Sequence, residues 1–337
     1  MTNAVQLPAF DLEVFADAQS AATHEGASVA AAIDAALRET GFLVVTGHGI
    51  DRDVRDRYFV AMEEFFSLPL EAKNAITIGN SSCHRGYVGL AAESLDGALG
   101  TADDAIGQAA AGDLKETLDT GIDHAPDHPE VVAGTPLFGS NQWPDLPGFR
   151  DAVEAYRDAA IEASERTHRG LAVALGLDPE FFLSQPGDFM YHLRLLHYPP
   201  QESVAPEPGQ LGCGAHTDYG TITLLADDGN GGLQVRQRSG EWVDVSIPEG
   251  ALVMNLGDLM AIWTNDRWVS NPHRVVNPVG VDRYSSPLFV EPNFHLRIEA
   301  LATCVPDGDV PRHEPVTVGS YLLGRFDGTH AYRNPFL

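Results

Sequence analysis

Apolar residues recur at helical spacing in three segments of the first half of the chain. These segments are residues 26–41, 51–69 and 148–177. An amphipathic helix places residues three and four positions apart on one face, so we expect a helix in each segment. Gly41 and Gly176 stand where the first and last of these helices should end. The first half should therefore consist mainly of helices that pack against something else.

From residue 189 to about 295 the pattern changes to short runs rich in β-branched and apolar residues, separated by turn signals. Many short strands at regular spacing predict a barrel or a double-sheet jelly roll. We expect strands in residues 190–198, 221–226, 233–237, 241–246, 251–256, 273–277 and 286–292, with an earlier one in residues 42–50.

The two patterns favour one domain of mainly β structure with added helices, because no linker rich in proline, glycine or serine separates the halves. Within residues 1–337 we expect a helical and mixed part (1–185), a β core that carries the site (186–295) and a C-terminal extension (296–337). Residues 91–113 are rich in alanine, glycine and aspartate, which predicts a long loop that can contribute to a binding pocket.

Composition narrows the class of protein further. The chain has 337 residues, 44% of them hydrophobic, and a formal net charge of -27. Such a charge repels nucleic acids and anionic lipids, so we expect neither nucleic acid nor membrane as a partner. Three scattered cysteines and a first segment without a basic and then apolar stretch favour a cytoplasmic protein. We expect a monomer or a weak homodimer that acts on a small molecule.

The residues that carry chemistry lie in the β-rich part. His216 and Asp218 are two positions apart ahead of a predicted strand, so their side chains point to the same face. His273 follows 55 residues after Asp218. Ten residues later, Arg283 and Ser285 form another pair with a two-residue spacing. Two histidines and one carboxylate make up the facial triad of non-haem iron(II) oxygenases, although zinc or manganese also accepts these ligands.

The arginine helps to decide the chemistry. Iron(II) with two neutral histidines and one carboxylate has a net charge near +1, and a chelating dianion such as 2-oxoglutarate lowers it to about -1. A guanidinium group facing the far carboxylate would restore neutrality, and Arg283 can make that contact in a fork-shaped way. The hydroxyl of Ser285 can bind the same carboxylate. The sequence itself does not say which carboxylate Arg283 would bind.

The combined motif resembles that of the isopenicillin N synthase-like family of iron(II)/2-oxoglutarate-dependent oxygenases. The resemblance extends from about residue 7 to 325 through stretches such as "ETGFLVVTGHGI", "FFSLPLEAK", "LLHYPP" and "NPHRVV". It implies a distorted jelly-roll (double-stranded β-helix) core braced by N-terminal and linking helices. It also implies that His216, Asp218 and His273 bind Fe(II), and that 2-oxoglutarate and dioxygen are co-substrates.

The activity that this resemblance implies is oxidation of an unactivated C–H bond of a small molecule, with succinate and CO2 as co-products. Hydroxylation is the default outcome, with desaturation or ring formation as variants. Two alternatives stay open. One is an iron oxidase of the same fold that uses no 2-oxoglutarate, in which Arg283 binds a substrate carboxylate. The other is a zinc-dependent hydrolase that uses the same three ligands.

Further residues are candidates for the pocket. Tyr198 matches a tyrosine that often contacts the co-substrate in this family, with an ordinary core tyrosine as the alternative. Arg194 is expected either to bind a carboxylate or to form a structural salt bridge. Glu93 falls where some relatives approach a cationic substrate group, although it can equally be a surface charge. Tyr219 and Phe289 are candidates for pocket walls or for core packing.

Four other histidines are interpreted as structural or surface residues, and one cysteine as a small buried apolar residue. None of them precedes a carboxylate by two positions on a predicted strand, and a thiolate ligand would favour zinc over iron. These residues are His48, His84, His192, His197 and Cys213.

Overall fold

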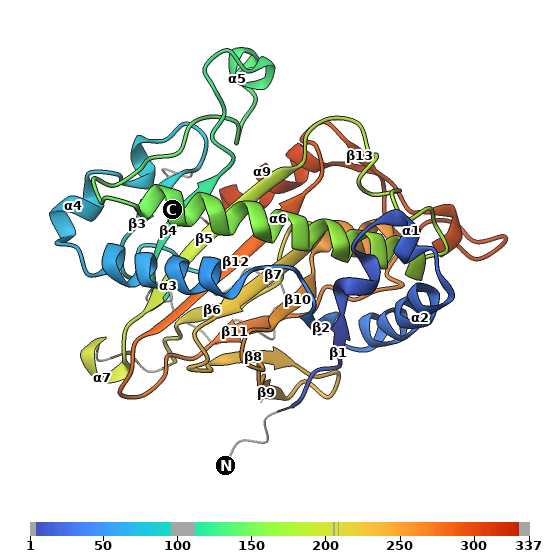
Figure 1. Ribbon diagram of the computed structural model, residues 1–337, viewed down its shortest axis with the longest axis horizontal. Coiled ribbons are helices and arrows are strands. Elements are labelled where there is room, and N and C mark those ends of the chain that lie inside the picture. Colours follow the sequence, from blue (N-terminus) through green and yellow to red (C-terminus); the bar gives the residue numbers. More distant parts are fainter. Residues whose placement is uncertain (1–4, 96–111, 205, 208, 330–337) are drawn as a thin grey trace.

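Two β-sheets occupy the centre of the protein, as the computed structural model shows for residues 5–95, 112–204, 206–207 and 209–329 (Figure 1). The larger sheet has eight strands in the spatial order β1-β2-β10-β7-β12-β5-β4-β3. Their bounds, in that order, are Ala9–Asp11, Phe42–Thr46, Leu252–Leu256, Ile222–Asp227, Arg283–Glu291, Met190–Tyr198, Glu116–Gly121 and Gly86–Val88. All neighbours in it are antiparallel except β1 and β2, which are parallel.

The smaller sheet has four strands in the order β6-β11-β8-β9, with bounds Cys213–His216, His273–Val275, Leu233–Arg236 and Trp242–Asp244. A short pair, β13 (Arg297–Ile298) and β14 (Val316–Thr317), follows the core. The strands expected in the second half are all present, and the sheets form the jelly-roll core that the resemblance implies.

The long helices cover the outer face of the larger sheet (Figure 1). The three expected helices are confirmed as α2 (His24–Glu39), α3 (Arg52–Phe66) and α6 (Phe149–Ala174). The chain leaves α2 and α6 through Gly41 and Gly176, both with positive φ, a conformation that glycine adopts without steric cost.

The remaining helices are shorter. The α-helices are α1 (Ala18–Ala21), α4 (Leu70–Asn74), α5 (Pro129–Ala133), α7 (Gln201–Val204), α8 (Asp258–Trp263) and α9 (Val318–Thr329), and 3-10 turns span Leu12–Phe15, Ile78–Asn80 and Ala302–Cys304. Within the described residues, no helix combines the length and the apolar character needed to cross a membrane.

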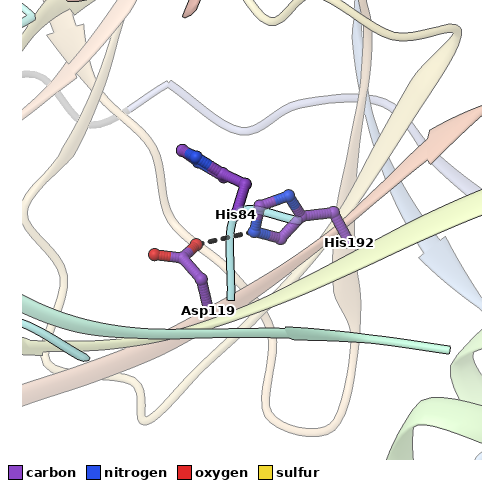
Figure 2. Close-up of side chains that lie close together, drawn as sticks. All are labelled: His84, Asp119 and His192. Atoms are coloured by element: carbon purple, nitrogen blue, oxygen red, sulfur yellow. Dashed lines mark hydrogen bonds and ion pairs between the residues drawn. The ribbon is translucent and has the colours of Figure 1, made fainter. Parts of the chain in front are cut away.

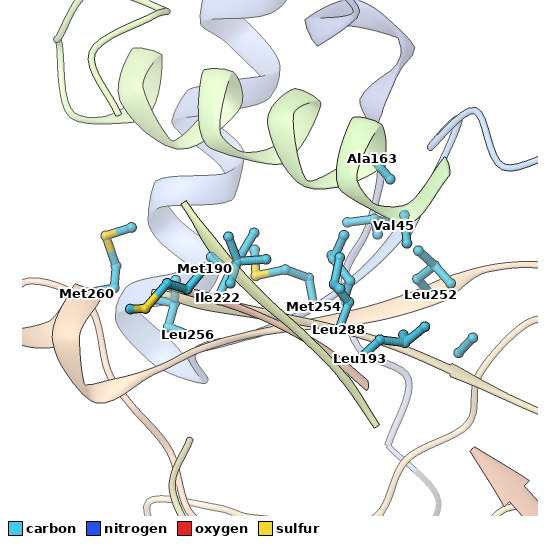
Figure 3. Close-up of a cluster of buried hydrophobic side chains, with 14 of the residues drawn as sticks. Val45, Ala163, Met190, Leu193, Ile222, Leu252, Met254, Leu256, Met260 and Leu288 are labelled. Carbon is cyan, nitrogen blue, oxygen red and sulfur yellow. The ribbon is translucent and has the colours of Figure 1, made fainter. Parts of the chain in front are cut away.

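Strand β12 shows how the sequence separates core from site. Leu288 and Val290 point outward into the apolar layer under the helices and are fully buried. Figure 3 shows Leu288 in this layer together with Leu193 and Ile222, on the side of the sheet that Ala163 of α6 covers. Residues of the opposite parity line the space between the two sheets. The period of two in a strand therefore assigns one face to stability and the other to function.

Strands β2, β3 and β4 come from residues 1–185, yet they belong to the same sheet as strands from residues 186–295. This shared sheet supports our proposal that the chain is a single domain. Of the expected loop at residues 91–113, residues 96–111 lie outside the described residues. Its two ends, at residues 91–95 and 112–113, lie near the site described next.

Candidate metal and co-substrate site

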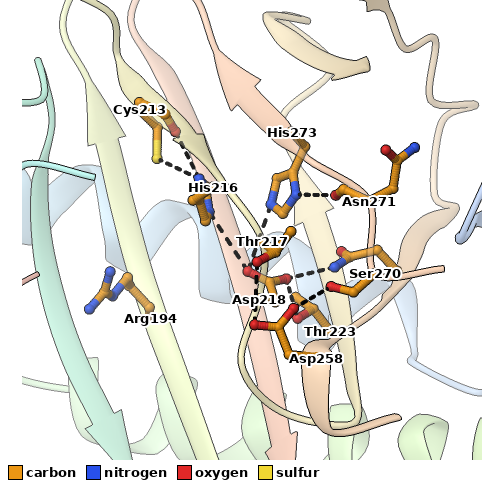
Figure 4. A network of polar contacts seen from close by, with 12 residues as sticks. Arg194, Cys213, His216, Thr217, Asp218, Thr223, Asp258, Ser270, Asn271 and His273 are labelled. Atoms are coloured by element: carbon orange, nitrogen blue, oxygen red, sulfur yellow. Dashed lines mark hydrogen bonds and ion pairs between the residues drawn. The ribbon is translucent and has the colours of Figure 1, made fainter. Parts of the chain in front are cut away.

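The three residues singled out by the sequence as metal ligands lie together between the sheets (Figure 4). His216 ends β6 and His273 begins β11, and the two are opposite each other in the antiparallel pairing. The Nε2 atoms of both imidazoles lie 3.7 Å from the same oxygen, Oδ1 of Asp218. Asp218 and His273, which are 55 residues apart in the chain, are thus brought within reach of one ion.

The other ring nitrogens fix the orientation of the two imidazoles. Nδ1 of His216 lies 2.8 Å from the Gly214 carbonyl oxygen, and Nδ1 of His273 lies 3.3 Å from that of Asn271. A carbonyl only accepts, so each Nδ1 donates and carries the proton. The lone pair of each neutral ring is then on Nε2, the atom that faces Asp218. This arrangement is typical of histidine ligands.

The Asp218 carboxylate is held in its ionised form. Its Oδ2 accepts hydrogen bonds from the Thr223 hydroxyl at 2.5 Å and the Asn255 amide at 2.6 Å. Burial alone would raise the pKa of Asp218, but the neighbouring histidines and these two donors lower it. Burial and the charge of His216 lower the pKa of His273 to about 4. One carboxylate and two neutral imidazoles form a donor set that fits iron(II).

Removing the Thr223 hydroxyl should weaken metal binding without removing a ligand. In Thr223→Val we expect the affinity for iron(II) to fall by about tenfold, because outer hydrogen bonds to a ligand typically contribute 10- to 100-fold. Equilibrium dialysis of iron(II) measures this, with the exposed Thr303→Val as the matched control. Unchanged affinity would show that the hydroxyl does not position Asp218.

A second group with metal-ligand chemistry consists of His84, Asp119 and His192, all buried (Figure 2). The sequence interpretation treated both histidines as isolated, since Asp119 comes from β4 and is remote from them in the chain. Oδ1 of Asp119 accepts hydrogen bonds from Nε2 of His192 and Nε of Arg194, both at 2.6 Å.

This second group is a poorer site for a cation than the first. Burial alone would raise the pKa of Asp119, but the charge of Arg194 and the bond from His192 hold it far below its usual value. The guanidinium group of Arg194 is thus already paired with this carboxylate, and its positive charge would repel a metal cation. We therefore assign the iron to the group of His216, Asp218 and His273.

Arg283 is fully buried on the inward face of β12. Its Nε donates to the Gly231 carbonyl, and its Nη1 donates to the Ser285 hydroxyl at 2.9 Å. Its Nη2 is buried and has no hydrogen-bond partner within the described part of the chain, and an Asp227 carboxylate oxygen lies 3.9 Å away. A buried donor without a partner is costly, so this atom fits a ligand oxygen.

Arg283 lines the same cavity as the two histidines and Asp218. Tyr198 is opposite Arg283 in the β5–β12 pairing, and the guanidinium carbon lies 4.8 Å above its ring centroid. Tyr198 is buried and also lines the cavity. It therefore has features of both alternatives that the sequence left open, a core tyrosine and a residue that contacts the co-substrate. The cavity thus combines the two features that a chelating diacid requires, a group able to hold a metal and a buried guanidinium group.

A second cavity adjoins the other side of the metal group. All four residues expected at a substrate pocket line it, namely Glu93, Arg194, Tyr219 and Phe289, and Phe326 and Glu291 add to its walls. Glu93 is buried and therefore is not a surface charge. Figure 4 shows Arg194 on the side of His216 away from His273.

Arg194 forms the salt bridges that the sequence gave as its alternative role. It donates to Asp119 through Nε and to both oxygens of Glu93 through Nη1, at 3.2 and 3.3 Å. Glu93 also lies 3.1 Å from the Lys115 ammonium nitrogen. The sequence did not single out Lys115, because a lone lysine in the chain gives no signal of its buried partners.

Glu291 is a pocket residue that the sequence did not single out. It has the same parity along β12 as Arg283, Ser285 and Phe289, so the alternation that begins at Arg283 leads directly to it. Burial, with a further contribution from the charge of Asp218, raises its pKa to about 8, although Arg85 opposes this rise. Continuing the two-residue period to the end of the strand would have identified it.

Comparisons with known proteins agree with this geometry. Residues 7–146 match the family model described as "non-haem dioxygenase in morphine synthesis N-terminal", and residues 189–292 match that of the 2OG-Fe(II) oxygenase superfamily. The chain is 39% identical to the 2-oxoglutarate-Fe(II) type oxidoreductase hxnY of Emericella nidulans, over 85% of its own length and 80% of the relative's. The chain belongs to the 2OG-Fe(II) oxygenase superfamily.

Two further proteins illustrate the range of this family. The chain is 33% identical to a homoarginine-6-hydroxylase of Arabidopsis thaliana, over 82% of its own length and 81% of the relative's. A full-length Neurospora crassa protein solved in complex with alpha-KG has a TM-score of 0.80 and 32% identity, with 96% of each chain covered. The same protein was also solved with thymine in addition, at 31% identity and a TM-score of 0.78.

These relatives, together with the His-Asp-His group, show that the protein is an oxidoreductase that takes iron(II) and 2-oxoglutarate. They speak against the two alternatives left open by the sequence, a zinc hydrolase and an oxidase without 2-oxoglutarate. The family acts on small molecules.

Proposed function

We propose that the protein hydroxylates an unactivated C–H bond of a small molecule, with conversion of 2-oxoglutarate and dioxygen to succinate and CO2. In this proposal His216, Asp218 and His273 hold the iron. Arg283, Ser285 and Tyr198 bind the distal carboxylate of 2-oxoglutarate. The observation that carries the proposal is the buried Nη2 of Arg283, which has no hydrogen-bond partner in the described structure and belongs to a side chain that lines the same cavity as the metal group.

Bound iron(II) would supply the activation of dioxygen for attack on a C–H bond. The protein's own residues do the positioning. Arg283 and Ser285 offer two donors to one carboxylate, which fixes the direction in which the diacid enters. Apolar side chains of the co-substrate cavity, including Leu196, Leu225 and Val275, leave little room for water around it.

The substrate would enter through the second cavity, which reaches His216 and Asp218 from the other side. Phe289 lines both cavities, as do Arg194, His216 and Asp218, so the two cavities adjoin. Arg194, Glu93 and Tyr219 would bind or orient the substrate there. Because related proteins are named for homoarginine or were solved with thymine, both compounds belong in a first substrate panel.

Oxygen-dependent formation of succinate tests this function. The purified protein with iron(II) should convert 2-oxoglutarate to succinate in air, slowly alone and faster with a true substrate, as NMR of the mixture would measure. One succinate should form for each hydroxylated product when the two are coupled. Oxygen consumption with product but without succinate would contradict the proposal.

A further inference from the structure

Glu291 has an unusual position for a buried carboxyl group. It is 8% exposed and lines the substrate cavity, yet it makes no hydrogen bond or ion pair within the described residues. Its carboxyl oxygens keep some contact with the cavity, because the fully buried side-chain atoms without a hydrogen bond do not include them. Leaving a polar group in a buried place without a partner is costly unless something else binds it. A ligand group in the cavity is the partner that this position offers.

The surroundings of Glu291 favour a neutral partner over a cation. Arg85 is the cation whose charge acts on Glu291, and it is itself buried without a carboxylate within ion-pair distance in the described part of the structure. A second cation placed beside Glu291 would therefore meet the charge of Arg85. A neutral N–H group donates to the carboxyl group without that repulsion.

Arg194 offers the complementary group on the other side of Phe289. Phe289 is opposite His192 in the antiparallel pairing of β5 with β12. Glu291 lies two residues after Phe289, and Arg194 lies two residues after His192. Because the strands run in opposite directions, Glu291 and Arg194 lie on opposite sides of Phe289. The Nη2 of Arg194 has no hydrogen-bond partner in the described structure and is not fully enclosed. Two carboxylates, Asp119 and Glu93, already balance its charge. A neutral carbonyl oxygen is thus a better partner for Nη2 than a third carboxylate.

The wall between these two groups is aromatic. Phe289 has an edge-to-face contact with His192, at 5.9 Å between centroids. Tyr219 and Phe326 form another wall, in edge-to-face contact at the same separation of 5.9 Å. Such walls favour a small flat body that carries polar groups at its edges.

We propose that the primary substrate is a small, uncharged nitrogen compound of the amide, lactam or ureide class. Its N–H donates to the carboxyl group of Glu291, its carbonyl oxygen accepts from Nη2 of Arg194, and its body contacts Phe289. This inference rests on the proposed function, because it assigns the substrate of the same site.

Binding of matched compounds to the anaerobic enzyme, loaded with iron(II) and 2-oxoglutarate, tests the assignment by calorimetry. The probes are thymine and δ-valerolactam, their fully N-methylated analogues, and homoarginine as a cation. At least one of the two N–H compounds should bind about tenfold or more tightly than its N-methylated analogue. Glu291→Gln keeps an acceptor oxygen and should bind that compound within about threefold of the wild type. Glu291→Leu should bind it as weakly as the analogue.

The exposed Glu299 supplies the matched controls, since Glu299→Gln and Glu299→Leu should change nothing. The assignment is overturned if neither N–H compound binds, if N-methylation has no effect, or if Glu291→Leu binds as the wild type does. It is also overturned if homoarginine binds and Glu291→Gln loses it, because the partner would then be a cation. Binding of 2-oxoglutarate and slow succinate formation, measured on the same samples, show separately whether the proposed function itself holds.

Discussion

Replacement of His273 by alanine should abolish stoichiometric iron(II) binding and reduce oxygen-dependent succinate formation to background. In the proposed site the imidazole is one of three protein ligands, and its Nε2 lies as close to the same Asp218 oxygen as Nε2 of His216 does. Changes to groups that merely support a ligand cost 10- to 100-fold in metal affinity, so removal of the ligand should cost at least about 100-fold. Equilibrium dialysis with iron(II) measures the affinity directly.

The matched control for this prediction is His24→Ala, since His24 is exposed at the start of α2. His273 also packs edge-to-face against Phe42, at 5.4 Å between centroids, so the variant can lose some stability. Circular dichroism and the melting temperature show whether it is still folded. A folded His273→Ala protein that binds iron(II) like the wild type would remove His273 from the metal site.

Much of the metal and co-substrate site could be predicted because its residues follow local rules. His216 and Asp218 are two positions apart, and so are Arg283 and Ser285. Arg283 and Ser285 both lie on β12, and a strand places such a pair on one face. His216 ends β6 and Asp218 follows just beyond it, so the short spacing alone keeps these two side chains close. Only the pairing of β6 with β11, which sets His273 opposite His216, needed the three-dimensional structure or a known family pattern.

The substrate pocket was less predictable because its residues depend on partners far away in the sequence. Whether Glu93 is a surface charge or a buried one depends on Arg194 and Lys115, neither of which is near it in the chain. The group of His84, Asp119 and His192 forms for a similar reason, through the pairing of β4 with β5. Glu291 was within reach of the alternation rule, because it shares one face of β12 with Arg283, Ser285 and Phe289.

Replacement of Arg283 by methionine should lower the affinity for 2-oxoglutarate by about 100-fold or more and leave the affinity for iron(II) nearly unchanged. The change removes the cation that would bind the distal carboxylate but none of the metal ligands. Loss of one partner of a buried, hydrogen-bonded charge pair costs about 2–5 kcal/mol, and each 1.4 kcal/mol corresponds to a factor of ten. Calorimetric titration of the iron-loaded protein with 2-oxoglutarate, under anaerobic conditions, measures this affinity.

Arg283→Lys distinguishes charge from shape. A lysine keeps the positive charge but cannot donate to Ser285, Gly231 and a carboxylate in one plane, so its affinity for 2-oxoglutarate should lie between those of the wild type and the methionine variant. Arg312→Met, at an exposed position, is the matched control. If iron(II) and 2-oxoglutarate affinities fell together in folded Arg283→Met, the arginine would be supporting the whole cavity instead of binding the co-substrate. A selective loss, in contrast, would place the carboxylate at Nη2 of Arg283, which has no hydrogen-bond partner within the described residues.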